Sequence, residues 1–169
     1  MLLHQMPKPT IAMVGGPAVG ARFSLAAACD LRFASEDAVF AASFMPNGLS
    51  GDYGGTFWWT RIAGTAVARR MYLLDETVPG AEALRLGMVH EVLPGPELAA
   101  RVREVAGQLT RTPAELLALV KDNLNQAEED ADRRRFLFAN EAVNQAKAGM
   151  AMMARMQKAV ARQAASDES

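Results

Sequence analysis

A short apolar segment, a glycine-rich turn and a helix-forming segment follow one another in residues 11–30, and this order restricts the fold more than any other feature. Residues 11–14 read IAMV, which fits a buried strand ending in a tight turn. GGPAVGA follows, and residues 23–30 read FSLAAACD, which contains good helix formers. LRFAS and AVFAAS, separated by Glu36 and Asp37, then predict two short strands. The pattern indicates an α/β fold.

The second half of the sequence is predominantly helical. Residues 56–74 have a helical pattern with a break at Gly64, and PGAEALRLG predicts a helix that ends before Gly87. MVHEVL alternates like a strand, and after it apolar residues recur at helical spacing. We therefore predict an α/β core over residues 1–94 and a C-terminal helical region, with a possible role in oligomerisation, over residues 95–169.

Methionines cluster near the C-terminus, at Met150, Met152, Met153 and Met156. Methionine side chains adapt to irregular apolar surfaces. The cluster predicts one apolar helix face, which packs either on the protein's own body or on a neighbouring subunit. The sequence leaves both alternatives open.

Composition excludes several classes of partner. The 169 residues contain 18 Lys and Arg against 19 Asp and Glu, a net charge of −1, which gives no long-range field for nucleic acid or an anionic membrane. No apolar run approaches the roughly 18 residues of a membrane span, and the N-terminus has too short an apolar run for a signal peptide, so a soluble cytoplasmic protein is expected. The single cysteine, Cys29, is expected to be a buried apolar residue.

The turn after the first strand does not have the spacing of a nucleotide-binding loop. GGPAVG is not G-x-G-x-x-G, and the spacing from Gly15 to Gly20 is followed by Ala21 and Arg22 where a P-loop needs Lys and Ser or Thr. What remains is a helix start whose backbone N–H groups are able to stabilise a developing oxyanion. The alternative is a turn that contains glycine only because it is tight.

Neither a metal site nor an exposed serine nucleophile is indicated. His4 and His90 lie far apart, with no Cys or carboxylate cluster at ligand spacing. Ser24 lacks the G-x-S-x-G context, and a helix would carry its side chain inward. Of the adjacent Trp58 and Trp59, at least one is expected in the core.

Asp52 is an isolated acid in the glycine-rich segment GLSGDYGGT. Glycine lets the backbone approach a ligand closely or adopt conformations that other residues avoid. A carboxylate partly desolvated there would have a raised pKa, which suits proton transfer near neutral pH. The alternative is an Asp that caps a helix or a turn.

Three separated motifs, KPTIAMVGGPAVGARFSLAAACDLRFASEDAVF, GLSGDYGGT and LLDETVPGAEALRLGMVHEVLP, together resemble the enoyl-CoA hydratase/isomerase family, or crotonase superfamily. The resemblance covers residues 7 to about 125. It implies a spiral of ββα turns followed by C-terminal helices that often form trimers, and acyl-CoA thioesters as substrates. It further implies that the N–H of Ala21, beside Gly20, is one of two donors to the thioester oxygen.

The resemblance also points to the reaction. Family hydratases carry two glutamates at the positions of Ser24 and Phe44, and neither residue transfers protons usefully. A double-bond shift needs only one base, and Asp52 lies where some isomerase members carry their acid. The resemblance therefore implies an isomerase-like proton transfer with Asp52 and Ala21 as catalytic groups. The residues expected to bind substrate are Gly20, Phe44, Gly48, Gly51, Gly54 and Gly55.

The family's N-terminal half, with the second oxyanion donor, has no counterpart in this sequence. Two alternatives therefore stay open: a non-catalytic fragment that associates through its helices, and a hydratase that uses an unrecognised base. No cofactor is expected besides coenzyme A as part of the substrate. The expected partners are an acyl-CoA thioester and further copies of the chain in a homo-oligomer, with neither nucleic acid nor membrane.

Overall fold

The computed structural model describes residues 2–128, 143, 147, 149–150 and 153–163. The chain divides into two compact units, Met1–Arg111 and Thr112–Ser169. The predicted domain boundary after residue 94 stays a prediction, while α6 (Gly95–Thr110) packs with the first unit.

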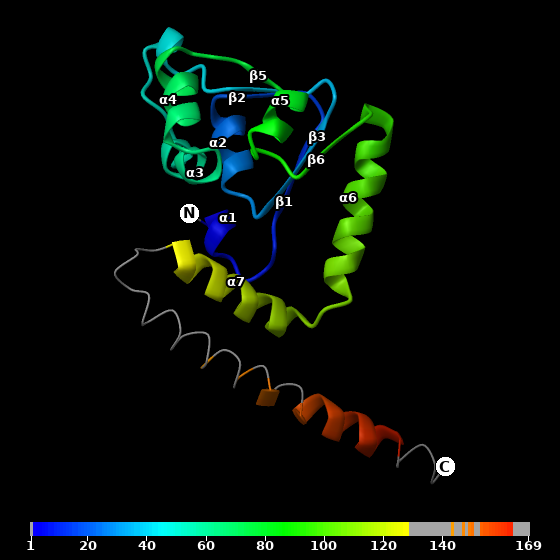
Figure 1. Ribbon diagram of the computed structural model, residues 1–169. Helices are drawn as coiled ribbons and strands as arrows, with labels where there is room; N and C mark the ends of the chain where they lie inside the picture. The colour runs from blue at the N-terminus through cyan, green and yellow to red at the C-terminus, as the bar shows by residue number, and fades with distance from the viewer. Residues whose placement is uncertain (1, 129–142, 144–146, 148, 151–152, 164–169) are drawn as a thin grey trace. The chain divides into compact units, whose positions relative to one another are not determined.

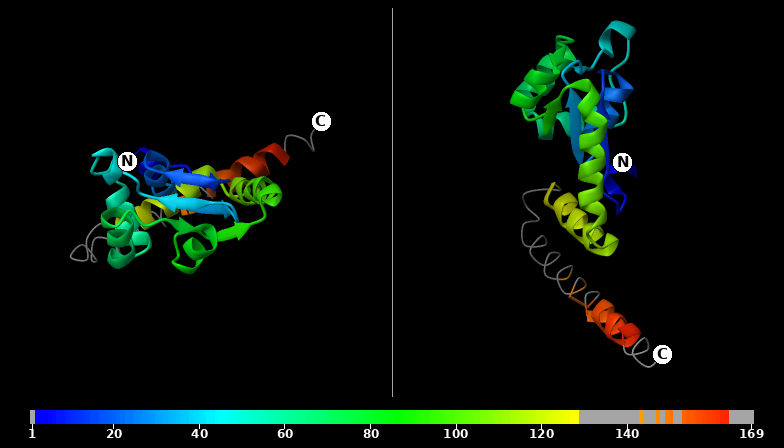
Figure 2. Two further views of the ribbon diagram at one scale, coloured as in Figure 1. Left: turned by 90° about the horizontal axis from the view of Figure 1, so that it is seen from above. Right: turned by 90° about the vertical axis from the view of Figure 1, so that its right-hand side faces the viewer.

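Two three-stranded sheets form the centre of the first unit (Figures 1 and 2). The first sheet is parallel and has the order β1 (Ile11–Val14), β3 (Leu31–Ser35), β6 (Glu91–Leu93). The second has the order β2 (Pro17–Val19), β4 (Val39–Ala41), β5 (Val78–Pro79). In that sheet β2 and β4 are parallel, and β5 is antiparallel to β4.

Helices connect and cover these strands. The helices of the first unit besides α6 are α1 (Leu2–Gln5), α2 (Ala21–Ala27), α3 (Gly55–Ile62), α4 (Thr65–Leu73) and α5 (Gly80–Arg85), with a 3₁₀ turn η1 (Met45–Asn47). Figure 1 shows α6 on one side of the first sheet, and α3 and α4 on the other. The predicted break at Gly64 is confirmed, because Gly64 has a φ of 84° and separates α3 from α4.

The predicted α/β class is confirmed, and its unit is a ββα turn. β1 and β2 lead into α2, and β3 and β4 lead through η1 and a loop into α3. The first strand of each pair enters the first sheet, and the second enters the other sheet. The chain therefore forms a spiral in which each turn adds one strand to each sheet.

The sequence does not predict the strand β2, because the segment GGPAVGA has the composition of a turn. Pro17 begins β2, a position where proline is tolerated because β2 is an edge strand. Residues 17–19 pair in register with residues 39–41 of β4. Tertiary pairing therefore overrides the turn propensity of the glycines on either side.

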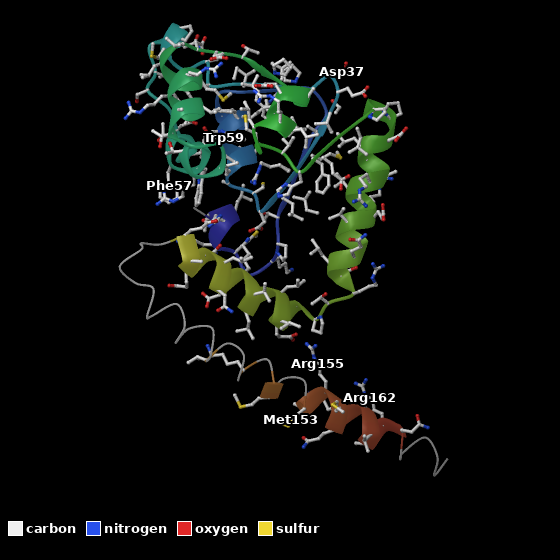
Figure 3. All side chains as sticks on the ribbon, viewed as in Figure 1. Asp37, Phe57, Trp59, Met153, Arg155 and Arg162 are labelled. Carbon is white, nitrogen blue, oxygen red and sulfur yellow. The ribbon has the colours of Figure 1, made fainter. Side chains whose placement is uncertain are left out.

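Aromatic side chains pack α2 against α3. The rings of Phe23 and Trp59 stack with centroids 4.6 Å apart, and Trp59 Nε1 donates a hydrogen bond to the Phe23 carbonyl. Both side chains are fully buried. Trp58 is buried too, so the expectation of at least one core tryptophan is confirmed. Figure 3 shows Trp59 in the interior and Phe57 on the outer side of α3, where Arg61 covers its ring.

A buried arginine closes the end of α2. The guanidinium of Arg32 donates from Nε to the Met88 carbonyl at 2.9 Å, and from Nη1 to the Cys29 carbonyl at 2.5 Å and the Ala27 carbonyl at 3.4 Å. The Ala27 and Cys29 carbonyls lie at the C-terminal end of α2, where backbone acceptors lack helical partners, and Met88 lies between α5 and β6. Arg32 thus holds α2 to β3.

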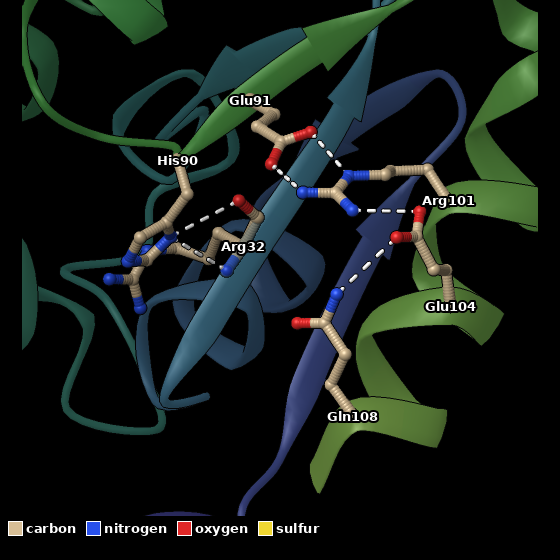
Figure 4. A network of polar contacts seen from close by, with 6 residues as sticks. All are labelled: Arg32, His90, Glu91, Arg101, Glu104 and Gln108. Atoms are coloured by element: carbon tan, nitrogen blue, oxygen red, sulfur yellow. Dashed lines mark hydrogen bonds and ion pairs between the residues drawn. The ribbon is translucent and has the colours of Figure 1, made fainter.

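The outer face of the first sheet is covered by α6. Phe33 on β3 forms a small buried cluster with Leu98 and Val105 of α6. At the rim, Arg101 donates two hydrogen bonds to the Glu91 carboxylate, at 2.8 and 2.6 Å, and one to Glu104 at 2.8 Å (Figure 4). The Arg101 guanidinium lowers the pKa of Glu91. These contacts attach β6 to α6.

The second unit is helical where it is described. It contains α7 (Ala114–Glu128) and helical backbone over residues 153–163, and Glu115 forms an ion pair with Arg155. Met150, Met153 and Met156 are exposed, and Met152 lies outside the described residues. Which surface packs on the methionine cluster stays a prediction.

Candidate functional site

The turn between β2 and α2 presents a backbone donor at the start of the helix. Gly20 has a φ of 59°, a conformation that favours glycine, and its N–H donates to the Ala41 carbonyl at 3.2 Å. Its own carbonyl accepts the first helical hydrogen bond, from Ser24 N–H. Ala21 is the first residue of α2, and its N–H has no hydrogen-bond acceptor within the described residues. The predicted oxyanion donor is therefore available.

Ser24 lies one helical turn beyond Ala21. Residues three apart lie on the same face of a helix, so the Ser24 side chain neighbours the Ala21 position. The predicted inward orientation is confirmed, since Ser24 is completely buried. Its hydroxyl oxygen has no hydrogen-bond partner within the described part of the chain.

The loop that carries Asp52 is strongly bent. Gly51, Tyr53 and Gly54 all have positive φ values, of 126°, 45° and 72°, so Asp52 is flanked on both sides by unusual backbone. For Tyr53 such a conformation is strained, and strained residues concentrate at functional sites. Asp52 itself is exposed. Its carbonyl accepts a hydrogen bond from the Gly55 N–H at 3.0 Å, which closes the turn before α3.

Gly55 brings this loop onto α2. A Cβ atom at Gly55 would lie 2.3 Å from Ser24 Oγ and 2.4 Å from Tyr72 Oη. Only glycine fits there, and the bend that carries Asp52 is fixed beside the face of α2 that starts with Ala21. The structure thus brings together the elements that bear both predicted catalytic groups.

Tyr72 of α4 lies beneath the loop and was not among the predicted site residues. Its ring would contact a Cβ on Gly51 at 3.5 Å, and its hydroxyl is directed at Gly55. Burial raises the pKa of the Tyr72 phenol, and the negative charge of Asp52 adds to this rise. No pattern in the sequence distinguishes Tyr72 from other apolar positions of a helix.

Phe44 lies in the core. Its side chain is 5% exposed and stacks on Tyr72, with ring centroids 6.1 Å apart and planes inclined by 9°. The preceding residue, Ser43, has a φ of 47°, and its N–H donates to Asp75 Oδ1 at 2.8 Å. Phe44 thus packs against Tyr72, and its predicted contact with substrate stays a prediction.

The other predicted glycines divide by position. Gly48 ends η1 with a φ of 68°, and Gly54 precedes α3, so both have backbone roles in the loop.

Within the described residues, no group of three or more His, Cys, Asp or Glu side chains is placed to hold a metal ion. Every helix in that part of the chain is too short or too polar to cross a bilayer.

Comparison with known proteins identifies the group to which this architecture belongs. The enoyl-CoA hydratase/isomerase family matches the sequence over residues 1–165. The chain belongs to this family. The ββα spiral is shared with solved enoyl-CoA hydratase structures, so the predicted crotonase-like fold is confirmed.

Individual family members span more than this chain. It is 33% identical over 129 residues to 4-chlorobenzoyl coenzyme A dehalogenase-1 of an Arthrobacter species, a match that covers 76% of this chain and 47% of the dehalogenase. It is 36% identical over 126 residues to the 1,2-epoxyphenylacetyl-CoA isomerase of Escherichia coli K12, covering 75% and 48%. The chain spans about half the length of these relatives.

A solved structure of the same family also extends beyond the region matched by this chain. A putative enoyl-CoA hydratase from Thermobifida fusca YX, in complex with acetoacetyl-CoA, superposes with a TM-score of 0.78 at 31% identity. The match covers 90% of this chain and 58% of that one.

Proposed function

We propose that this chain contributes the proton-transfer part of an isomerase-like active site acting on an acyl-CoA thioester. In the proposed reaction Asp52 takes the α-proton of the thioester, and the electron pair moves onto the thioester oxygen. The N–H of Ala21 donates a hydrogen bond to that oxygen. Asp52 then returns the proton to a different carbon, which shifts the double bond.

The observation that supports this proposal most directly is the contact of Gly55 with Ser24. It fixes the Asp52 bend beside the face of α2 that begins at Ala21. A fixed backbone donor stabilises a developing oxyanion better than water, which must reorganise. An isomerase also needs one acid that is accessible, and Asp52 is exposed.

Two buried residues favour isomerisation over hydration. Ser24 and Phe44 stand where the resemblance places the glutamates of hydratases, and neither carries a carboxylate. Both side chains are buried, so neither is placed to orient and deprotonate an attacking water molecule. Asp52 is thereby left as the proton carrier.

The relatives support the substrate class. The names of two of them specify acyl-CoA compounds, and the Thermobifida protein was solved with acetoacetyl-CoA. We propose an acyl-CoA thioester as substrate and no resident cofactor, since coenzyme A enters with the acyl group. The residues proposed to contact it are Gly20, Phe44, Gly48, Gly51, Gly54 and Gly55. We further propose that the C-terminal helices hold copies of the chain in a homo-oligomer.

Exchange of the α-proton of butyryl-CoA in D₂O, followed by NMR, tests the first half of this reaction. The chain is expected to accelerate the exchange, and Asp52→Asn to reduce it by about 100- to 10,000-fold, the usual contribution of a general base. Asp37→Asn is the matched control, because Asp37 is exposed in the turn between β3 and β4 (Figure 3). It should leave the exchange rate unchanged.

Three outcomes would contradict the proposal. Equal exchange rates for the parent chain and Asp52→Asn would remove Asp52 from the reaction. No acceleration by the parent chain would favour the non-catalytic alternative. Hydration of crotonyl-CoA by the same sample would favour a hydratase with another base.

A further inference from the structure

The segment that carries Asp52, residues 45–54, has no buried residue of its own. Every residue in this range is exposed, whereas Phe44 before it and Gly55 after it are buried. The segment is also rich in glycine, which leaves its backbone many accessible conformations. The core of the protein therefore holds this segment at its two ends.

The Asp52 carboxylate has no anchor of its own either. Among the described residues, the Asp52 side chain takes part in no hydrogen bond and no ion pair. The Asp52 carbonyl, in contrast, accepts the hydrogen bond from the Gly55 N–H that closes the bend. The position of the carboxylate therefore follows from the backbone of the bend.

Both ends of this segment meet one side chain, that of Tyr72 on α4, the helix beside α3 (Figure 1). At the first end, the Phe44 ring stacks on the Tyr72 ring. At the second end, a Cβ atom on Gly55 would lie 2.4 Å from Tyr72 Oη. Within the segment, a Cβ atom on Gly51 would lie 3.5 Å from Tyr72 Cε1. One side chain thus supports the bend before, within and after residues 45–54.

Tyr72 also reaches α2, the helix that begins at Ala21. The centroid of its ring lies 6.0 Å from that of Phe23, with the planes inclined by 48°. Its hydroxyl and the Ser24 hydroxyl face the same point, the Cβ position of Gly55. Tyr72 therefore connects the bend to the helix that bears the proposed oxyanion donor.

The hydroxyl of Tyr72 does not stabilise the fold through a hydrogen bond. It is buried and has no hydrogen-bond partner in the part of the chain that the structure describes. A buried hydroxyl without a partner costs free energy. Phenylalanine would avoid this cost and keep the ring, so the contribution of the hydroxyl is its contact with Gly55.

We propose that Tyr72 is a positioning residue, which fixes both ends of residues 45–54 and thereby holds the Asp52 carboxylate at a set distance from the Ala21 N–H. Tyr72 acts through the backbone of the bend and does not contact substrate. A displacement of about 1 Å at a reacting group costs about 100-fold in rate. The consequence for the reaction rests on the proposed function, whereas the hold on the bend does not.

Amide hydrogen exchange, followed by NMR, tests the hold on the bend without substrate. Gly55 N–H closes the bend, and Ala63 N–H donates to the Trp59 carbonyl at the other end of α3. Tyr72→Leu is expected to speed exchange at Gly55 at least about tenfold and to leave Ala63 unchanged, because the bend opens while α3 stays folded. Tyr72→Phe keeps the ring and should speed exchange at Gly55 by less than about threefold.

The α-proton exchange of butyryl-CoA tests the consequence for the reaction. Tyr72→Leu is expected to lower the turnover rate about 30- to 100-fold with little change in KM, and Tyr72→Phe to recover most of this loss. In an Asp52→Asn background, Tyr72→Leu should cause no further loss, because it acts through Asp52. A general defect of the fold would lower the rate by the same factor in both backgrounds.

Leu73→Ala is the matched control. Leu73 is the next residue on α4 and is 58% exposed, so its substitution should change neither the exchange at Gly55 nor the turnover rate. The single cysteine, Cys29, reports on α2 in every variant. It is partly exposed, which corrects the expectation of a buried residue, and its rate of reaction with DTNB should stay the same.

Two results would overturn the proposal. One is an exchange rate at Gly55 that Tyr72→Leu leaves unchanged, or raises only together with that of Ala63. The other is an equal loss of turnover from Tyr72→Leu with and without the Asp52 carboxylate. If Asp52→Asn leaves the α-proton exchange unchanged, the proposed function fails, and the comparison of the two amides still decides whether Tyr72 holds the bend.

Discussion

Gly55 lies directly against Ser24, so closely that a Cβ on Gly55 would be 2.3 Å from the serine Oγ and 2.9 Å from its Cβ. This contact joins the first turn of α3 to the first turn of α2. Since Ala21 begins α2 and the Asp52 bend precedes α3, the whole candidate site depends on it. The two elements can approach this closely because Gly55 has no Cβ atom.

Gly55→Ala is therefore expected to destabilise the fold. The added methyl group cannot fit without moving Ser24 or Tyr72, and overpacking of this kind costs about 1–3 kcal/mol. Urea unfolding followed by tryptophan fluorescence measures the loss. Gly107→Ala is the matched control, because Gly107 lies inside α6 with nothing near its Cβ position. It should stabilise by about 0.5–1 kcal/mol. Equal effects of the two substitutions would show that Gly55 is not tightly packed.

The charge of Asp52 should be detectable at Tyr72. The negative charge of Asp52 contributes to the raised pKa of Tyr72, because it disfavours a second negative charge nearby. Asp52→Asn is therefore expected to lower the pKa of Tyr72. Burial remains the larger cause, so the pKa should stay above the usual value of 10.0.

Ultraviolet absorbance of the phenolate measures this pKa. The sequence has two tyrosines, so the titration is done in a Tyr53→Phe background, where Tyr72 is alone. Asp37→Asn in the same background should leave the titration curve in place. If Asp52→Asn leaves it in place too, the carboxylate lies too far from Tyr72 to belong to the same site.

Local sequence patterns predicted much of the fold. The apolar run at residues 11–14 is sufficient to predict β1, and Gly64 is sufficient to predict the break between α3 and α4. Both signals are local, since they depend only on apolar residues and glycines close together in the sequence. β2 was missed for the opposite reason. Its residues have turn propensity, and only pairing with the distant β4 makes them a strand.

The candidate site was predictable only in part. Asp52 is recognisable because an isolated acid among glycines is unusual, and the start of α2 follows from its turn. Tyr72 contributes through its place beneath the Gly51 and Gly55 backbone, which depends on how α4 folds back on the loop. The burial of Phe44 likewise depends on the Tyr72 ring, on which Phe44 stacks. Such long-range contacts leave no periodic signal in the sequence.

The buried guanidinium of Arg32 should be essential for stability. Arg32→Met would leave the carbonyls of Cys29 and Met88 without a donor, at about 1–3 kcal/mol for each buried acceptor. Arg32→Lys should recover only part of this loss, because an ammonium group does not reproduce the fork of the guanidinium.

Urea unfolding of these variants gives the comparison. The control is Arg69→Lys on the exposed face of α4, which should change stability by less than about 0.5 kcal/mol. A similarly small effect of Arg32→Lys would show that one donor suffices at the end of α2.

His90 should make stability depend on pH near neutrality. His90 Nδ1 lies 3.1 Å from the backbone N of Arg32 and 3.2 Å from the Arg32 carbonyl oxygen, so it accepts from the first or donates to the second according to the ring tautomer (Figure 4). The His90 ring also stacks on Phe33. Burial, and secondarily the charge of Arg32, lower the pKa of His90 below its usual value of 6.5. The unfolded chain therefore binds a proton at a higher pH than the folded chain does.

Stability is accordingly complete above a pH of about 6.5 and falls as the pH decreases from there toward the folded pKa, because the unfolded state then takes up the extra proton. His90→Gln removes this titration. The parent chain is expected to lose more stability than His90→Gln between about pH 7.5 and pH 5.5, measured as urea midpoints at each pH. Above about pH 7.5 the difference between the two proteins should be constant, since His90 is neutral in both states. A parent chain whose midpoint falls no more steeply than that of His90→Gln would mean that the imidazole titrates alike in the folded and unfolded states.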